Sequence, residues 1–253
     1  MLPALRSAAT GLIAHQAMMD VTANNLANVN TPGFKRSLPR FTDLLHPQAG
    51  RGGEPLDRIG GGVRVDEVRR DFRQGIMEAT ENPYHLCVEG EGFFTVRLED
   101  GSLGFARAGI LGVDASGRLT LNGRFFLEPP LQLPPGGKEL VVDERGTVRV
   151  RTASGEEREL GRIGLARFPN PEGLEARGDG IFLPTEASGQ PVTALPGEEG
   201  TGLLRQGYLE RSNVDVADEI VRMISALRAY QLNAKMVQAS DEALDAANRI
   251  VRA

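Results

Sequence analysis

The chain has 253 residues, of which 40% are hydrophobic and 5% aromatic, with no tryptophan and a formal net charge of −5. This apolar content is enough for the core of one or two domains, whereas the negative balance disfavours binding of DNA or RNA through a basic surface. No run of eighteen apolar residues occurs, so no membrane-spanning helix is expected. The N-terminus also lacks the compact apolar block of a cleaved secretory signal.

Residues 1–30 are predicted to form a helix with an unusually uncharged surface. Four large apolar residues recur every seven positions, as in a helical seam: Leu5, Leu12, Met19 and Leu26. Arg6 and Asp20 are the formal charges of the segment, although a solvated single helix normally carries a charged face. Two interpretations remain open: a weakly amphipathic helix packed on its own domain, or a helix contacted on several sides in an assembly. Thr31-Pro32-Gly33 ends the helix, because proline lacks a donor and glycine admits positive φ.

A linker or extended hairpin is expected over residues 34–67. This segment contains two glycine-rich stretches: residues 48–53 predict a flexible tip, and residues 60–62 predict a flexible connector. The triple glycine is followed by neither Lys-Ser/Thr nor a helical pattern, so a phosphate-binding loop is excluded.

Residues 68–205 are predicted to form an antiparallel β domain with an aliphatic core. Turn signals recur about every ten residues, at Asp114–Gly117, Asn122–Gly123, Pro134–Gly137, Asp143–Gly146 and Ala153–Gly155. Asn122-Gly123 is typical of a type I′ hairpin turn. The single Cys87 lies between Leu86 and Val88, which favours a packed small hydrophobe over a reactive thiol.

Residues 206–253 are predicted to return the chain and to form a long helix that starts after Asp215, a residue suited to capping free N–H groups. Between residues 216 and 251, eleven positions separated alternately by four and three residues form a heptad seam, and nine of the eleven are apolar or Tyr. The seam residues proposed as an assembly interface are Ile220, Met223, Leu227, Tyr230, Ala234, Val237 and Leu244. Such a helix cannot bury its seam alone, so it needs partners.

Catalytic chemistry has no motif in this sequence. His15, His46 and His85 are far apart, and neither paired metal-ligand spacing nor a nucleophile elbow occurs. Gly90-Glu91-Gly92 is half of a dinucleotide fingerprint, but a strand-like stretch follows it. We therefore predict no catalytic residue, no metal, no cofactor and no small-molecule substrate.

Four segments resemble the bacterial flagellar rod and hook axial proteins, and the resemblance is closest to the distal rod members. The segments cover nearly the whole chain in order: Met19–Arg36, Val88–Phe94, Gln206–Asp215 and Ala229–Lys235. In distal members the region matching 45–62 is usually longer than it is here.

The resemblance implies a non-enzymatic subunit of the flagellar basal body that polymerises as a helical tube, transmits torque from motor to hook and leaves an export channel. Implied partners are copies of itself, proximal rod proteins, hook protein, the P- and L-ring proteins and the flagellar type III export apparatus. The chain would be exported unfolded without a cleaved signal.

The expected fold is therefore α+β. Long N- and C-terminal helices pair as a coiled-coil-like stalk, and a central all-β domain is inserted between them, with boundaries at 1–33, 34–67, 68–205 and 206–253. Three amides near the end of the first helix could bond to neighbouring subunits or cap that helix: Asn24, Asn25 and Asn28. The alternatives are a proximal rod or hook-like axial protein, and a β-domain binding module or hydrolase oligomerised by a helical stalk.

Overall fold

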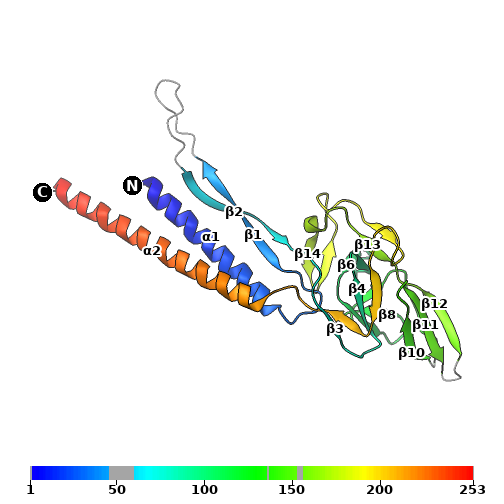
Figure 1. The fold of residues 1–253 in the computed structure, drawn as a ribbon. Coiled ribbons are helices and arrows are strands. Elements are labelled where there is room, and N and C mark those ends of the chain that lie inside the picture. The colour runs from blue at the N-terminus through cyan, green and yellow to red at the C-terminus, as the bar shows by residue number, and fades with distance from the viewer. Residues whose placement is uncertain (1, 46–59, 136, 153–155, 253) are drawn as a thin grey trace. The chain divides into compact units, whose positions relative to one another are not determined.

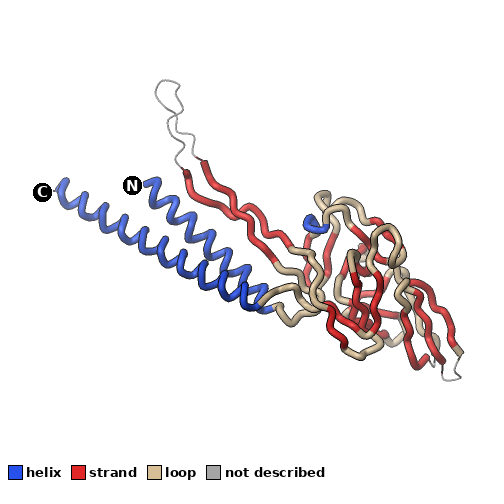
Figure 2. Tube along the Cα trace, in the orientation of Figure 1, coloured by secondary structure: helices blue, strands red, loops and turns tan. Residues whose placement is uncertain are grey.

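The computed structural model describes residues 2–45, 60–135, 137–152 and 156–252. The chain divides into two compact units: unit 1 comprises residues 1–27, 37–70 and 214–253, and unit 2 comprises residues 28–36 and 71–213. The fold is α+β, as predicted: in chain order, an N-terminal helix precedes and a C-terminal helix follows the strands of a central β domain (Figures 1 and 2). The chain passes between the units four times, after residues 27, 36, 70 and 213.

Unit 1 contains two helices and a β-hairpin. Helix α1 (Leu2–Ala27) lies beside both helix α2 (Val216–Arg252) and the hairpin (Figure 1). The predicted cap of α2 is confirmed, because Asp215 Oδ1 accepts the N–H groups of Ala217 at 2.8 Å and Asp218 at 3.1 Å. Neither described helix combines the length and apolarity of a membrane span.

The hairpin consists of antiparallel strands β1 (Ser37–Leu45) and β2 (Gly60–Arg70). The predicted flexible connector at Gly60–Gly62 is wrong, because these glycines open β2. The strand needs a glycine at position 62: a Cβ on Gly62 would lie 2.1 Å from Thr10 Oγ1, and the φ of Gly62 is +105°. Thr10 Oγ1 also accepts the N–H of Val63 at 3.2 Å. The glycine-rich stretch 48–53 lies outside the described residues.

The described residues of unit 2 form short strands and a 3-10 turn, Pro171–Gly173. The strands are β3 (Met77–Ala79), β4 (His85–Glu89), β5 (Phe93–Arg97), β6 (Leu103–Ala106), β7 (Gly109–Val113), β8 (Leu119–Leu121), β9 (Phe125–Leu127), β10 (Gly137–Val142), β11 (Thr147–Thr152), β12 (Glu157–Arg162), β13 (Leu165–Arg167), β14 (Glu175–Gly178), β15 (Ile181–Leu183), β16 (Val192–Ala194), β17 (Leu203–Gln206) and β18 (Tyr208–Glu210).

The described strand pairs of unit 2 are antiparallel: some join consecutive strands, such as β7 with β8, and others join strands far apart in the sequence, such as β4 with β17 and β3 with β18. The main sheet runs β14-β15-β6-β5-β9-β8-β7-β4-β17, with β13 joining β5 to β16, while β10-β11-β12 and β18-β3 form smaller sheets. The predicted β8–β9 turn is confirmed: Asn122 and Gly123 have φ of 54° and 68°, and Arg124 N donates to Leu121 O at 3.2 Å. Positive φ at both central positions defines the type I′ geometry.

Two apolar clusters fill unit 2. The larger is mainly aliphatic, as expected, and includes Leu86, Leu121, Ile163 and Leu165. The second is aromatic and was not predicted. Its rings pack edge to face with centroids 4.8–5.9 Å apart, and they belong to Phe72, Phe93, Phe105, Phe168 and Phe182.

Cys87 is fully buried in β4, which confirms that it packs as a small hydrophobe. Burial, aided by the charge of Glu210, raises the pKa of its thiol to about 11. We expect iodoacetamide at pH 8 to leave Cys87 unmodified in the folded protein and to alkylate it in urea, as read by mass spectrometry. A control cysteine at the exposed turn residue Ala115 should react at once. Equal labelling rates for the two thiols would contradict this burial.

Candidate assembly surface

The most buried face of α1 is a row of small side chains. Its members are separated by three or eight residues, which places them on one side of the helix: Ala8, Gly11, Ala14, Thr22 and Asn25. A Cβ on Gly11 would lie 2.7 Å from Asn233 Nδ2 of α2. The two helices therefore approach closely where α1 has no side chain.

The faces that meet inside unit 1 are rotated from the predicted seam. The most buried residues of α2 are Glu219 and Ala226, 1% and 2% exposed, and each stands one position before a predicted seam residue, Ile220 or Leu227. On α1, Gly11 and Asn25 likewise precede seam leucines. The remaining predicted apolar positions are half-buried: Leu5, Leu12, Met19, Leu26, Met223, Tyr230, Ala234, Val237 and Leu244. Their role between subunits stays a prediction.

One flank of α2 leaves an apolar row in contact with solvent. This row, here called the apolar stripe, is 42–45% exposed at each member: Val216, Ile220, Ile224 and Leu227. Spacings of four and three place these side chains on one side of the helix. Exposed hydrophobic residues are ordinary when scattered, but a continuous row marks an interaction surface. The stripe includes two of the predicted interface residues.

Asn25 ties three elements of unit 1 together. Its Nδ2 donates to Ser37 O at 2.8 Å and to Glu219 Oε2 at 3.3 Å, and its Oδ1 accepts Ser37 N–H at 2.8 Å. The side chain is buried, so its amide is used inside the subunit. Asn24 is exposed, and Asn28 Oδ1 accepts the Thr31 hydroxyl at 3.2 Å.

Unit 2 contains a buried charge cluster, formed by Lys35, Arg107 and Glu210, whose side chains are 1%, 5% and 0% exposed. Glu210 Oε1 accepts Lys35 Nζ at 2.6 Å and the N–H of Gly75 at 2.8 Å, while Oε2 accepts Arg107 Nε. Burial alone would raise the pKa of Glu210, but Arg107 and Lys35 outweigh it and hold that pKa below its usual value. Burial lowers the pKa of Lys35, against the pull of Glu210.

Arg107 and Lys35 also donate hydrogen bonds to backbone carbonyls. The Arg107 guanidinium donates to Val88 O at 2.9 Å, to Gly90 O at 2.6 Å and to Gly92 O, and Lys35 Nζ donates to Arg73 O at 2.8 Å. Sequence analysis did not single out this cluster, although Lys35 and Glu210 lie inside two of the motif segments. The sequence offered one signal that Arg107 is buried: this charged residue lies between two alanines in a region rich in predicted strands.

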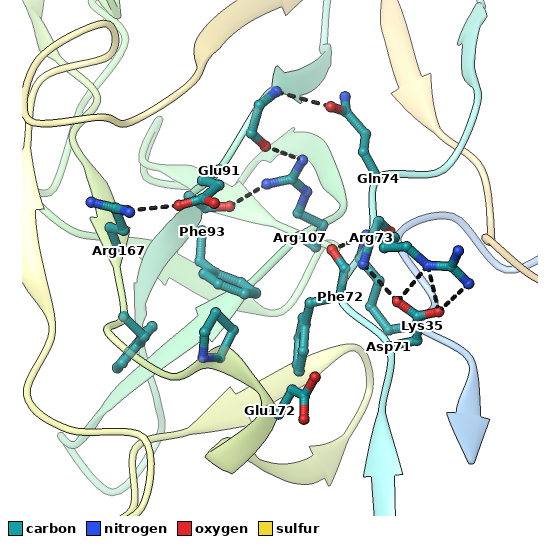
Figure 3. A pocket seen from close by; sticks show the side chains of 14 residues that line it. Lys35, Asp71, Phe72, Arg73, Gln74, Glu91, Phe93, Arg107, Arg167 and Glu172 are labelled. Atoms are coloured by element: carbon teal, nitrogen blue, oxygen red, sulfur yellow. Dashed lines mark hydrogen bonds and ion pairs between the residues drawn. The ribbon is translucent and has the colours of Figure 1, made fainter.

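A cavity of about 420 Å³ adjoins this cluster in unit 2 (Figure 3). Phe72, Phe93 and Phe168 contribute to its apolar wall. Its four lysine and arginine side chains are held in ion pairs: Lys35 and Arg107 with Glu210, Arg73 with Asp71, and Arg167 with Glu91. The described lining residues include no His, Cys, Ser or Thr.

Three protein-family models match separate parts of the chain. "Flagella basal body rod protein" matches residues 5–35, "Flagellar hook protein FlgE/F/G D1 domain" matches residues 87–150, and "Flagellar basal body rod FlgEFG protein C-terminal" matches residues 205–250. The first and third matches fall on segments that contribute α1 and α2, and the second falls on the β domain.

Full-length relatives carry the same description. The flagellar basal-body rod protein FlgG of Borreliella burgdorferi is 39% identical over 264 aligned residues, which cover 100% of both chains. Its counterpart in Buchnera aphidicola is 39% identical over 254 residues, covering 96% of this chain and 98% of the relative. That of Caulobacter vibrioides is 36% identical over 260 residues, covering 98% and 99%.

Proposed function

This chain belongs to the FlgG family of flagellar basal-body rod proteins and is a structural subunit of the rod, and we propose that it builds the rod by packing its terminal helices against those of neighbouring copies. The observation that carries the proposal is the apolar stripe of α2, which unit 1 leaves in contact with solvent. In this arrangement α1 and α2 pair as a coiled-coil-like stalk within the subunit, while the stripe serves contacts between subunits.

The expected energy of one such contact is modest. Covering four side chains that are already more than half buried yields on the order of 3 kcal/mol. A helical polymer repeats this contact at every subunit, so torque is distributed over many small interfaces and none needs high affinity. The helices would line a tube that leaves an export channel.

The subunit acts as a building element rather than as an enzyme. Its proposed neighbours are further copies of itself, proximal rod proteins, hook protein and the P- and L-ring proteins, after delivery by the flagellar type III export apparatus. The family models support the axial neighbours in this set, because their descriptions name both rod and hook proteins.

Replacing Leu227 by Asp tests the proposal. A carboxylate in the middle of the stripe would have to be buried at every subunit contact, at a cost on the order of 3 kcal/mol each. We expect rod assembly and swimming to be abolished while unit 2 keeps its thermal transition. Electron microscopy of isolated basal bodies and a soft-agar assay measure the two outcomes.

Ser225→Asp is the matched control, because Ser225 is an exposed residue two positions away and so points from the other side of the same helix. The control should assemble and swim. Normal rods in Leu227→Asp would contradict packing through the stripe. A discrete soluble oligomer, unchanged by either substitution, would favour the binding-module alternative.

A further inference from the structure

We infer that six residues of unit 2 form a joint that fastens together the chain segments continuing into unit 1, so that load entering along one segment is shared by the others. This inference rests on the proposed role in torque transmission. The joint, here called the junction cluster, lies within unit 2 and comprises Lys35, Arg36, Asp71, Arg107, Glu210 and Asn213.

Three of the four chain crossings end on a closed ring of hydrogen bonds. Arg36 N donates to Asn213 Oδ1 at 2.8 Å, Asn213 Nδ2 donates to Asp71 O at 2.8 Å, and Asp71 N donates to Arg36 O at 2.8 Å. Arg36, Asp71 and Asn213 are the last or first residues of unit 2 at these crossings. The side chain of Asn213 thus bonds to the backbone of the two other segments at the residues where they pass between the units.

The buried charge cluster also connects these three segments: the first ends at residue 36, the second begins at residue 71 and the last ends at residue 213. Lys35 belongs to the first segment and Glu210 to the last, 175 positions apart. Glu210 also binds the second segment through Gly75 N, and its own carbonyl accepts Gly33 N–H at 2.8 Å. A Cβ on Gly75 would lie 2.0 Å from Arg211 O, so the second and last segments run in backbone contact.

Polar contacts of buried charged side chains hold the first segment in place. Within residues 28–36 the buried side chains are those of Lys35 and Arg36, both charged. Neither apolar cluster of unit 2 contains a residue of this segment. Because each interaction of a buried charge is strongly directional, such a joint resists sliding of one segment past another.

A Lys35→Met variant removes the charge that bridges the first and last segments while keeping a similar stem. We expect amide hydrogen exchange in the full-length protein to accelerate on the order of a hundredfold at Gly33, Arg36, Asp71 and Gly75. Amides of β5 and β8 should exchange at the unaltered rate. Asn213→Ala should give the same pattern. Arg124→Met, which breaks two exposed ion pairs of unit 2, should leave exchange at the four amides unchanged. Uniform acceleration through β5 and β8, or none at the four amides, would overturn the joint.

In cells, Lys35→Met should assemble rods in normal number but swim more slowly than the Arg124→Met strain when the medium is made viscous. Equal swimming under that load, or failure to build rods, would overturn the role in load sharing. The proposed function fails separately: Leu227→Asp that still assembles would refute packing through the stripe and leave the exchange result on the joint intact.

Discussion

Replacing Arg107 by Met is expected to lower the free energy of unfolding of unit 2 by about 3–5 kcal/mol, because it breaks a buried ion pair from one side. The substitution leaves Glu210 with a single cation in a buried site. It also removes the donors of three backbone carbonyls, those of Val88, Gly90 and Gly92. Urea unfolding of the full-length protein, followed through the near-ultraviolet signal of the β domain, measures the change.

The matched control is Arg97→Met, whose ion pair with Glu128 lies at the surface, the arginine being 53% exposed. This pair should contribute about 0–1 kcal/mol. A loss for Arg107→Met no larger than that of the control would contradict the account of the cluster.

The pH dependence of the same variant gives a second readout. Since Arg107 and Lys35 hold the pKa of Glu210 below its ordinary value of 4.5, the folded state binds fewer protons at this site than the unfolded state does. The stabilisation is therefore present above that ordinary value and is lost as pH falls through the folded pKa. Arg107→Met should weaken this acid-dependent contribution.

Asn25→Leu is expected to destabilise unit 1 by about 2–4 kcal/mol, because the leucine leaves the buried N–H and C=O of Ser37 without their partner. The bond to Glu219 is lost as well. Leucine has a similar size, so the effect isolates hydrogen bonding from packing. Urea unfolding monitored by helical circular dichroism, with amide exchange at Ser37, measures the loss.

Gln16→Leu makes the same chemical change at an exposed position of α1. Its effect should stay within about 0.5 kcal/mol. If both variants unfolded at the same urea concentration, the network around Asn25 would contribute nothing beyond helix propensity.

Local features were predictable because their causes lie within a few residues. Asp215 caps α2 with its own side chain, and Asn122-Gly123 carries the positive φ that its turn demands. The apolar repeats indicated both terminal helices, because apolar residues recur at spacings of three and four on a helix face and at every second position in a strand. The motif segments identified the family for the same reason, as contiguous runs of the sequence.

Which face of each helix is buried was decided by the tertiary structure. The heptad pattern favoured the leucines and isoleucines, yet α1 presents Gly11 to the side chain of Asn233 in α2. A small side chain permits a close backbone approach that a large one prevents, so the large residues Ile220 and Leu227 move to the flank. Periodicity records where apolar residues recur but not which of two adjacent rows meets a given partner.

The sequence by itself determined the two terminal helices, the β character of the middle, the cap at Asp215, the turn at Asn122-Gly123 and the buried thiol. Only the tertiary structure decided the strand at Gly60–Gly62, the aromatic cluster and the buried charges of Lys35, Arg107 and Glu210. The physical reason is distance along the chain. A charge can be buried when its partner arrives from another segment, here 175 positions away for Lys35 and Glu210, and no local pattern encodes that meeting.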